Sequence, residues 1–217
     1  LSERLNIDPS KIEVMVPLAV PAPRGNPSQA ELEHVRRKYA LPEHFILMIG
    51  TVEPRHNHQA VFAALADAAS PAGVVVCGRR TAWSDYLLGY ARARRIAARV
   101  DFIYELTPSD LPALFRLARV FAYLPDADAE ASVVPVVEAL RAGLPMVLSD
   151  TQVNREAAGE AAAYVRPEAR GEVLAALENA LEDVSWRRTM QERERRRAEL
   201  FSEYAVAERL MQIYTSL

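Results

Sequence analysis

Two glutamates, Glu130 and Glu138, stand out among the residues that could do chemistry. The stretch from 133 to 142 has the apolar pattern of a buried helix, and within it only Glu138 and Arg141 are charged. Burying a carboxylate without a partner costs free energy. Glu138 is therefore expected either to face a cleft or to form an ion pair with an arginine.

The start of the same helix is a candidate anion site. Ser132 is predicted to be its N-cap, which places the backbone amides of Val133 and Val134 in the first turn. The N–H groups there have no acceptor within the helix, and together with the helix dipole they favour a negatively charged ligand, most often phosphate. Glu130 comes just before this turn. The simpler alternative is a surface loop followed by a salt-bridged Glu138.

A second loop follows the apolar run Phe45–Ile49 and leads into another predicted helix. Gly50 allows a ligand to approach the backbone closely. Arg55 offers a planar guanidinium that suits phosphate. The simpler alternative is an ordinary loop in which Arg55 pairs with Glu53 or another carboxylate. The Gly-x-Gly-x-x-Gly pattern of dinucleotide-binding loops is absent from the sequence.

Short apolar runs that alternate with helix-length segments must position these loops. This alternation is typical of βαβ units, in which parallel strands are buried on both faces. We expect a doubly wound, Rossmann-like α/β domain over 12–167, entered by a connecting segment at 1–11 and followed by helices over 168–217. In such a sheet the ligand lies beyond the carboxyl ends of the strands. The predicted strands are Ile12–Val16, Phe45–Ile49, Val74–Cys77, Val100–Ile103, Val120–Leu124, Met146–Leu148 and Ala162–Val165.

Several helix ends carry recognisable caps. Ser28 and Glu31 form a capping-box pattern before a helix. Asn57 is predicted to be the N-cap of the helix through Leu65. Gly143 lies where a left-handed glycine would end the helix that carries Glu138.

The composition excludes several classes of protein. The 217 residues carry a net charge of −3, which gives no reason to expect nucleic acid as a partner. The single cysteine excludes an internal disulfide and a cysteine-cluster zinc site. No apolar run reaches the length of a transmembrane helix, and no signal peptide opens the chain. Because the sequence begins at Leu1, we expect it to be part of a longer protein that lacks its N-terminal portion here.

In combination, these segments resemble the C-terminal, donor-binding domain of a GT-B glycosyltransferase of family four, the "group 1" glycosyltransferases. The resemblance covers nearly the whole chain, from Lys11–Val20 onwards. Phe45–Asn57 resembles the family's loop with Gly-Thr-x-Glu-Pro-Arg-Lys-Asn. Glu130 and Glu138 fall on its paired-glutamate motif, and Glu156–Ala162 resembles its next turn.

The resemblance implies retaining transfer of a sugar from a UDP- or GDP-linked donor to a glycan or lipid-linked acceptor. It places Glu138 on the ribose hydroxyls and Glu130 at the transferring sugar, where it would act in catalysis. It places Arg55 and the amides near Ser132 and Val133 on the diphosphate. It also implies that no metal or cofactor is needed and that an N-terminal domain supplies the acceptor site. The resemblance further implies a cytoplasmic enzyme, which could associate peripherally with the inner face of the membrane. The residues that the resemblance places at the donor are Gly50, Thr51, Arg55, His56, Ser132, Val133, Val134 and Glu138.

The sequence departs from the family pattern at several points, including the usual Gly-Tyr after the Phe102-Ile103 strand, where it has Tyr104 and Glu105. Ala131 and Val133 replace two glycines between the paired glutamates, and His56 replaces the lysine that contacts phosphate. Histidine is mostly neutral at pH 7. Two interpretations follow: an active enzyme with an altered donor or sugar pose, or a non-catalytic module with a degenerate donor site that serves as a scaffold or partner domain. An epimerase or phosphorylase on the same scaffold would need His and Arg/Lys constellations that the sequence does not show.

Overall fold

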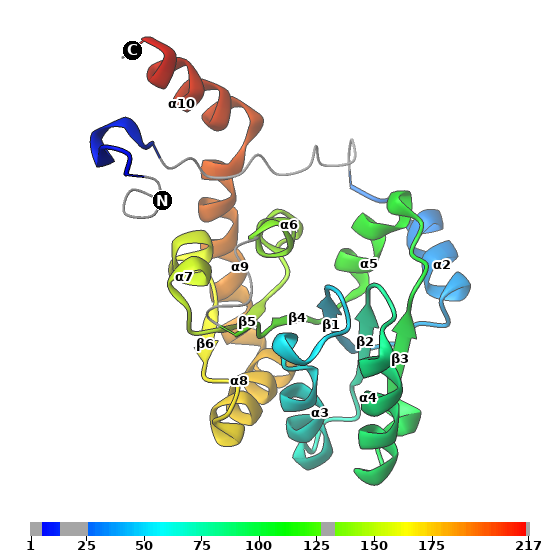
Figure 1. Ribbon diagram of the computed structural model, residues 1–217. Coiled ribbons are helices and arrows are strands. Elements are labelled where there is room, and N and C mark those ends of the chain that lie inside the picture. The colour runs from blue at the N-terminus through cyan, green and yellow to red at the C-terminus, as the bar shows by residue number, and fades with distance from the viewer. Residues whose placement is uncertain (1–5, 14–25, 127–132, 216–217) are drawn as a thin grey trace.

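A computed structural model describes residues 6–13, 26–126 and 133–215 (Figure 1). Six parallel strands form one sheet in the order β3-β2-β1-β4-β5-β6. This is the Rossmann strand order, so the expected fold class is confirmed. The strands are β1 (Phe45–Ile49), β2 (Gly73–Cys77), β3 (Val100–Ile103), β4 (Val120–Tyr123), β5 (Met146–Ser149) and β6 (Ala163–Val165).

Helices cover both faces of the sheet. The expected strand at 12–16 lies mostly outside the described residues, and the division of the chain at 12 and 168 stays a prediction. The α-helices are α2 (Gln29–Lys38), α3 (His58–Asp67), α4 (Ala82–Ala93), α5 (Leu111–Leu117), α6 (Val134–Ala142), α7 (Gln152–Ala158), α8 (Arg170–Glu182), α9 (Val184–Ala198) and α10 (Glu203–Thr215). Short 3-10 turns occupy Pro9–Lys11, Pro54–His56, Ala97–Arg99, Pro108–Asp110 and Glu199–Phe201.

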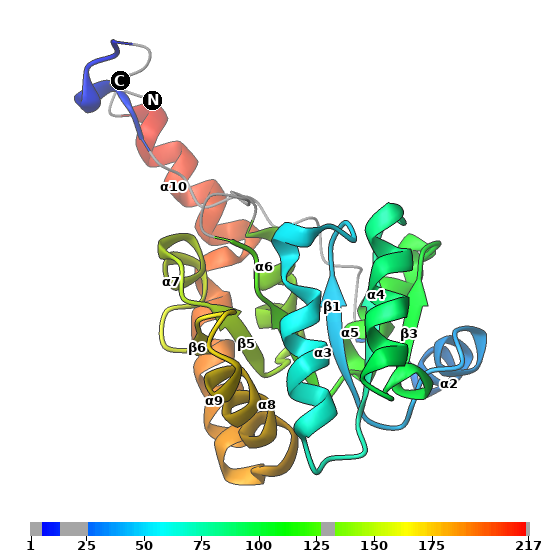
Figure 2. The ribbon, with the colours of Figure 1, turned by 60° about the horizontal axis from the view of Figure 1, so that its bottom comes forward.

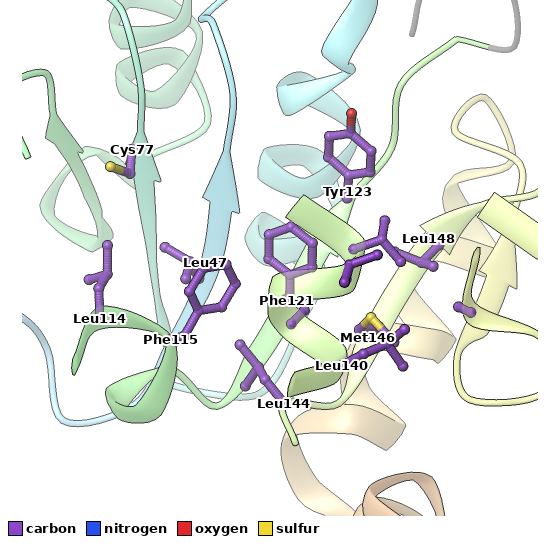
Figure 3. Packing of buried hydrophobic residues seen from close by; sticks show 14 of the residues in the cluster. Leu47, Cys77, Leu114, Phe115, Phe121, Tyr123, Leu140, Leu144, Met146 and Leu148 are labelled. Carbon is purple, nitrogen blue, oxygen red and sulfur yellow. The ribbon is translucent and has the colours of Figure 1, made fainter. Parts of the chain in front are cut away.

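Each strand alternates its side chains between two hydrophobic cores. In β1, Phe45 and Leu47 pack into the core beneath α2, α5, α6 and α7, whereas Ile46 and Met48 pack into the core beneath α3, α4 and α8. Figure 3 shows side chains of the first core, with Phe121 of β4 among residues from β1, β5, α5 and α6. Two apolar cores explain why the strands read as continuous apolar runs.

The helix caps match the sequence in two places. Ser28 and Glu31 form a complete capping box, in which the Ser28 N–H donates to the Glu31 carboxylate at 2.7 Å. Gly143 takes φ of 62° after α6, a left-handed conformation that glycine adopts without steric cost. These two ends fix where α2 begins and where α6 ends.

Helix α10 extends away from the body of the domain (Figure 2). Tyr204, Met211 and Tyr214 on this helix are largely exposed. Arg209 pairs with Glu13 of the N-terminal segment at 3.0 Å. The two described ends of the chain therefore lie side by side, as Figures 1 and 2 both show.

One buried side chain in α9 is at odds with its surroundings. Helix α9 packs against α6 and α8, and Glu194 on its inner face is completely buried. Neither carboxylate oxygen has a hydrogen-bond partner among the described residues. Burial raises the pKa of Glu194 to about 8, so the buried carboxyl is mostly protonated at neutral pH.

We expect the free energy of unfolding of Glu194→Gln, relative to that of the wild type, to increase as the pH rises. In the unfolded chain Glu194 ionises with the ordinary glutamate pKa of 4.5, whereas the folded chain holds the proton to about pH 8. The wild type therefore loses free energy of unfolding between these two values, by a few kcal/mol in total. Urea unfolding at pH 4.5, 6 and 8 measures the difference, with the exposed Glu192→Gln on the same helix as the control. A difference between variant and wild type that stays constant with pH would contradict the assignment.

Candidate functional site

The loops after β1 and β4 meet at the point where the strand order reverses. Strand β1 lies between β2 and β4, so the crossovers from β1 and from β4 leave in opposite directions. In doubly wound sheets the ligand crevice lies at this point, beyond the carboxyl ends of the strands. The N–H of Asp126 donates to the Arg55 carbonyl at 2.9 Å. The two loops singled out in the sequence are therefore neighbours in space.

Asn57 joins the same two loops, and it occupies the predicted N-cap position of α3 without the side-chain hydrogen bond expected there. It has a left-handed backbone with φ of 52°, and its side chain makes no capping hydrogen bond to α3. The side-chain amide instead donates to the Leu124 carbonyl at 2.9 Å and to the Asp126 carboxylate at 2.6 Å. A tertiary contact thus takes the place of the local cap.

His56 lies inside the first loop. The ring is buried, and Nδ1 donates to the Thr51 carbonyl. Gly50, with φ of 144°, faces it closely, because a Cβ there would stand 3.5 Å from the His56 ring. The neighbouring His58 is buried too, and burial, followed by the charge of His56, lowers its pKa to about 4. Thr51 and His56 thus hold the shape of the loop, with His58 neutral beneath them at pH 7.

Arg55 pairs with Glu53 across the top of the loop. The Nε atom lies 2.6 Å from a Glu53 carboxylate oxygen, which is the simpler arrangement that the sequence left open. This hydrogen bond is the main reason that the pKa of Glu53 lies below its usual value. The Arg55 side chain remains 43% exposed, so a ligand can reach it from solvent.

Helix α6 leads away from the other loop. It begins at Val134, with Val133 in the N-cap position at φ of −97° and Pro135 in the first turn. Its N-terminus lies at the carboxyl edge of the sheet, where the helix dipole favours anions. The N-cap is therefore Val133, one residue after the predicted Ser132, so Val134 and not Val133 begins the first turn. Glu130 and Ser132 fall outside the described residues, and their predicted contacts with the donor stay predictions.

Glu138 lies one turn into α6 and is half-buried. No residue in the described ranges forms a hydrogen bond or ion pair with its carboxylate. Burial raises the pKa of Glu138, and the positive charge of Arg141 opposes the shift. A carboxylate in this condition gains from any ligand that brings hydroxyl donors to it.

Gly78 holds the loops after β1 and β2 together, although its sequence context alone does not single it out. A Cβ at this position would lie 1.8 Å from the Gly50 carbonyl oxygen. The contact extends the sheet past its strands, since the Gly50 N–H donates to the Cys77 carbonyl and the Val52 N–H to the Arg79 carbonyl. A glycine directly after a buried strand was the available signal. Only the spacing of the two strands, which the sequence does not contain, shows that the backbones touch.

The described part of the chain lacks both a metal-binding cluster and a membrane-spanning helix. No group of three or more His, Cys, Asp or Glu side chains is arranged to hold a metal ion within residues 6–13, 26–126 and 133–215. No helix of those ranges has the length and apolar character needed to cross a bilayer.

Comparison with known proteins places the sequence among transferases. The model of the family "Glycosyl transferases group 1" matches residues 31–197. The O-antigen chain mannosyltransferase B of Escherichia coli is 29% identical over 181 residues, covering 81% of this chain and 47% of the relative. The D-inositol 3-phosphate glycosyltransferase of Salinispora tropica is 29% identical over 174 residues, covering 69% of this chain and 36% of the relative. The chain therefore spans half or less of the length of both.

Solved structures show the same fold. WaaG, a glycosyltransferase involved in lipopolysaccharide biosynthesis, superposes with a TM-score of 0.79 at 18% identity, over 98% of this chain and 58% of WaaG. The Anabaena protein HepE, crystallised with UDP and glucose, superposes with a TM-score of 0.76 at 16% identity, over 88% of this chain and 53% of HepE.

We expect Gly78→Ala to destabilise the protein by about 1–3 kcal/mol or more, because the added methyl group would collide with the Gly50 backbone. Gly89→Ala is the matched control. Gly89 lies within α4 with no atom within 4 Å of the added Cβ, so the same change there should stabilise by about 0.5–1 kcal/mol. Urea unfolding of both variants checks the prediction, and equal effects would show that the two loops are not in contact.

Proposed function

The chain belongs to the group 1 glycosyltransferases, and we propose that it is the donor-binding half of an enzyme that transfers a sugar from a nucleotide-diphosphate sugar to a glycan or lipid-linked acceptor. The observation that carries this proposal is the half-buried Glu138 behind the N-terminus of α6 at the crevice, with no hydrogen-bond donor among the described residues. The two hydroxyls of a nucleotide ribose are the donors that this carboxylate lacks.

The diphosphate lies between the N-terminus of α6 and Arg55 in this proposal. The amides of Val134 and Val136 have no acceptor within the helix, and Pro135 between them contributes no N–H. Charge builds up on the leaving diphosphate during transfer, and fixed cations and helix amides stabilise it without a metal ion. Glu130, just before this turn in the sequence, contacts the hydroxyls of the transferring sugar and stabilises positive charge near its anomeric carbon.

The relatives support a donor of this class. HepE has been crystallised with UDP-glucose, and two sequence relatives are named as glycosyltransferases. We infer a UDP- or GDP-linked sugar, transferred with retention of configuration. The acceptor site and the catalytic base lie on a part of the enzyme outside this chain. The names of WaaG and of the Escherichia coli relative favour a surface polysaccharide as the product, made at the cytoplasmic face of the membrane.

The second candidate function is a non-catalytic module that keeps the fold and has lost donor binding. Two observations favour it over an ordinary donor site. Arg55 is paired with Glu53, and His56, which replaces the family's lysine, is buried within its loop. Donor binding would then have to displace or reuse the Glu53 pair, and His56 would have to reach phosphate from inside the loop.

Calorimetric titration of this chain with UDP, GDP and their sugar conjugates separates the two functions. We expect one nucleotide to bind in the micromolar to millimolar range and Glu138→Ala to weaken it more than tenfold, because hydrogen bonds to a charged group contribute about 1.5–3 kcal/mol. Glu208→Ala, an exposed carboxylate on α10, is the control. If the folded chain binds none of the nucleotides, the degenerate-module interpretation replaces the donor-site proposal.

We also expect the isolated chain not to transfer sugar. If half of the cleft lies on another part of the enzyme, donor binding here leaves the acceptor unpositioned and the reaction without proximity. Incubating the chain with labelled UDP- and GDP-sugars and a panel of glycan acceptors measures this. Transfer above the background hydrolysis rate would refute the division of labour between the two halves.

A further inference from the structure

Two adjoining hollows lie at the amino-terminal edge of the sheet, opposite the donor loops. One, of about 430 Å³, follows the side of α9. The other, of about 130 Å³, lies between α9, the end of α5 and the turn from α6 to β5. Arg187 and Gln191 line both, so the two hollows form one groove. Figures 1 and 2 show α9 running from the end of α8 towards α10.

Arginines dominate the walls of this groove. The five that line it are Arg116, Arg119, Arg187, Arg188 and Arg195. Within the described part of the chain, Glu192 is the one carboxylate on the same walls. No described residue forms an ion pair with any of the five arginines.

Arg187 and Arg119 are the innermost pair, and the fold explains only part of their placement. Arg187 is 8% exposed, and its Nη1 donates to the carbonyls of Leu181 and Ala180 at 2.6 and 3.2 Å, at the C-terminus of α8. The remaining N–H groups of Arg187 make no hydrogen bond to a described residue. Burial, followed by the positive charge of Arg119, lowers the pKa of Arg187, while Glu182 and Asp183 raise it. The two guanidinium groups therefore repel each other.

The outer arginines have no structural explanation within the fold. Arg116, Arg188 and Arg195 are exposed and make no side-chain hydrogen bond to the described residues. Arg188 and Arg195 lie seven residues apart on α9, which places both on the face that lines the groove. Arginines and glutamates alternate along the sequence of this helix, but the structure gathers Arg187, Arg188 and Arg195 on one side.

We propose that this groove binds a phosphate group, either of a soluble phosphate compound or of an anionic lipid headgroup. Guanidinium groups suit phosphate because they donate two parallel hydrogen bonds and keep their charge when partly buried. Phosphate would accept from the unused N–H groups of Arg187 and relieve its repulsion with Arg119. The outer arginines would neutralise the remaining charge. The groove is separate from the donor site, since it lies where the strands begin rather than where they end.

Binding of two probes tests the proposal: inorganic pyrophosphate by calorimetry, and vesicles of phosphatidylglycerol against phosphatidylcholine by sedimentation. The test variant is the charge reversal Arg188→Glu with Arg195→Glu. The control is Arg92→Glu with Arg196→Glu, two exposed arginines that do not line the groove but change the net charge equally. UDP titration of each variant verifies that the donor site is unaffected.

We expect at least one probe to bind the wild type and to bind the test variant at least tenfold more weakly, while the control changes less than threefold. Pyrophosphate binding alone identifies a soluble phosphate as the ligand, and vesicle binding alone identifies the lipid headgroup. If the test and control variants lose the same affinity for a probe, binding depends only on the net charge of the protein, and the proposal is overturned. Absence of binding by both probes at low ionic strength would also overturn it.

Discussion

The parallel pairing of β1 with both β2 and β4 is the constraint on which the rest of the domain depends. In register, Phe45–Ile49 pairs with Gly73–Cys77 on one side, and Ile46 and Leu47 pair with Val120 and Phe121 on the other. Each parallel pair requires a crossover helix, and crossovers that turn away from β1 in opposite directions bury both faces of the sheet. The same reversal leaves the loops after β1 and β4 side by side. Core packing and the position of the crevice therefore have one cause.

A parallel sheet with helical crossovers also makes its two edges electrostatically different. Helix N-termini gather at the carboxyl edge, where they favour anions without any charged side chain. Helix C-termini gather at the amino edge, and their carbonyls draw cations, as the bonds from Arg187 to the end of α8 show. A positive surface at the amino edge must therefore come from side chains. The groove there carries five arginines, more than the helix carbonyls at this edge bind. The arginines that remain make this edge a second candidate site for an anion.

Much of this arrangement could be predicted from local patterns. The capping box at Ser28 and the glycine after α6 need only neighbouring residues, and the apolar runs need only burial on both faces. Asn57, Gly78 and Arg187 could not be interpreted in this way. Their roles depend on Leu124, Gly50 and Leu181, residues that are close only after the sheet has formed. For the proposed donor site, Glu138 and Arg55 were singled out from residue type and position, and their roles stay predictions, whereas the pairing of Arg55 with Glu53 was one of two open alternatives.

Two glutamates on packed helices show how solvent access separates function from structure. Glu138 on α6 and Glu194 on α9 both lack hydrogen-bond partners among the described residues, and burial raises the pKa of both. Glu194 is sealed, so no ligand can reach it, and the fold must carry the cost of keeping it protonated. Glu138 is only half-buried, so a ligand with hydroxyl groups can reach it and satisfy its carboxylate. An unsatisfied carboxylate thus indicates a binding site only where a path from solvent leads to it.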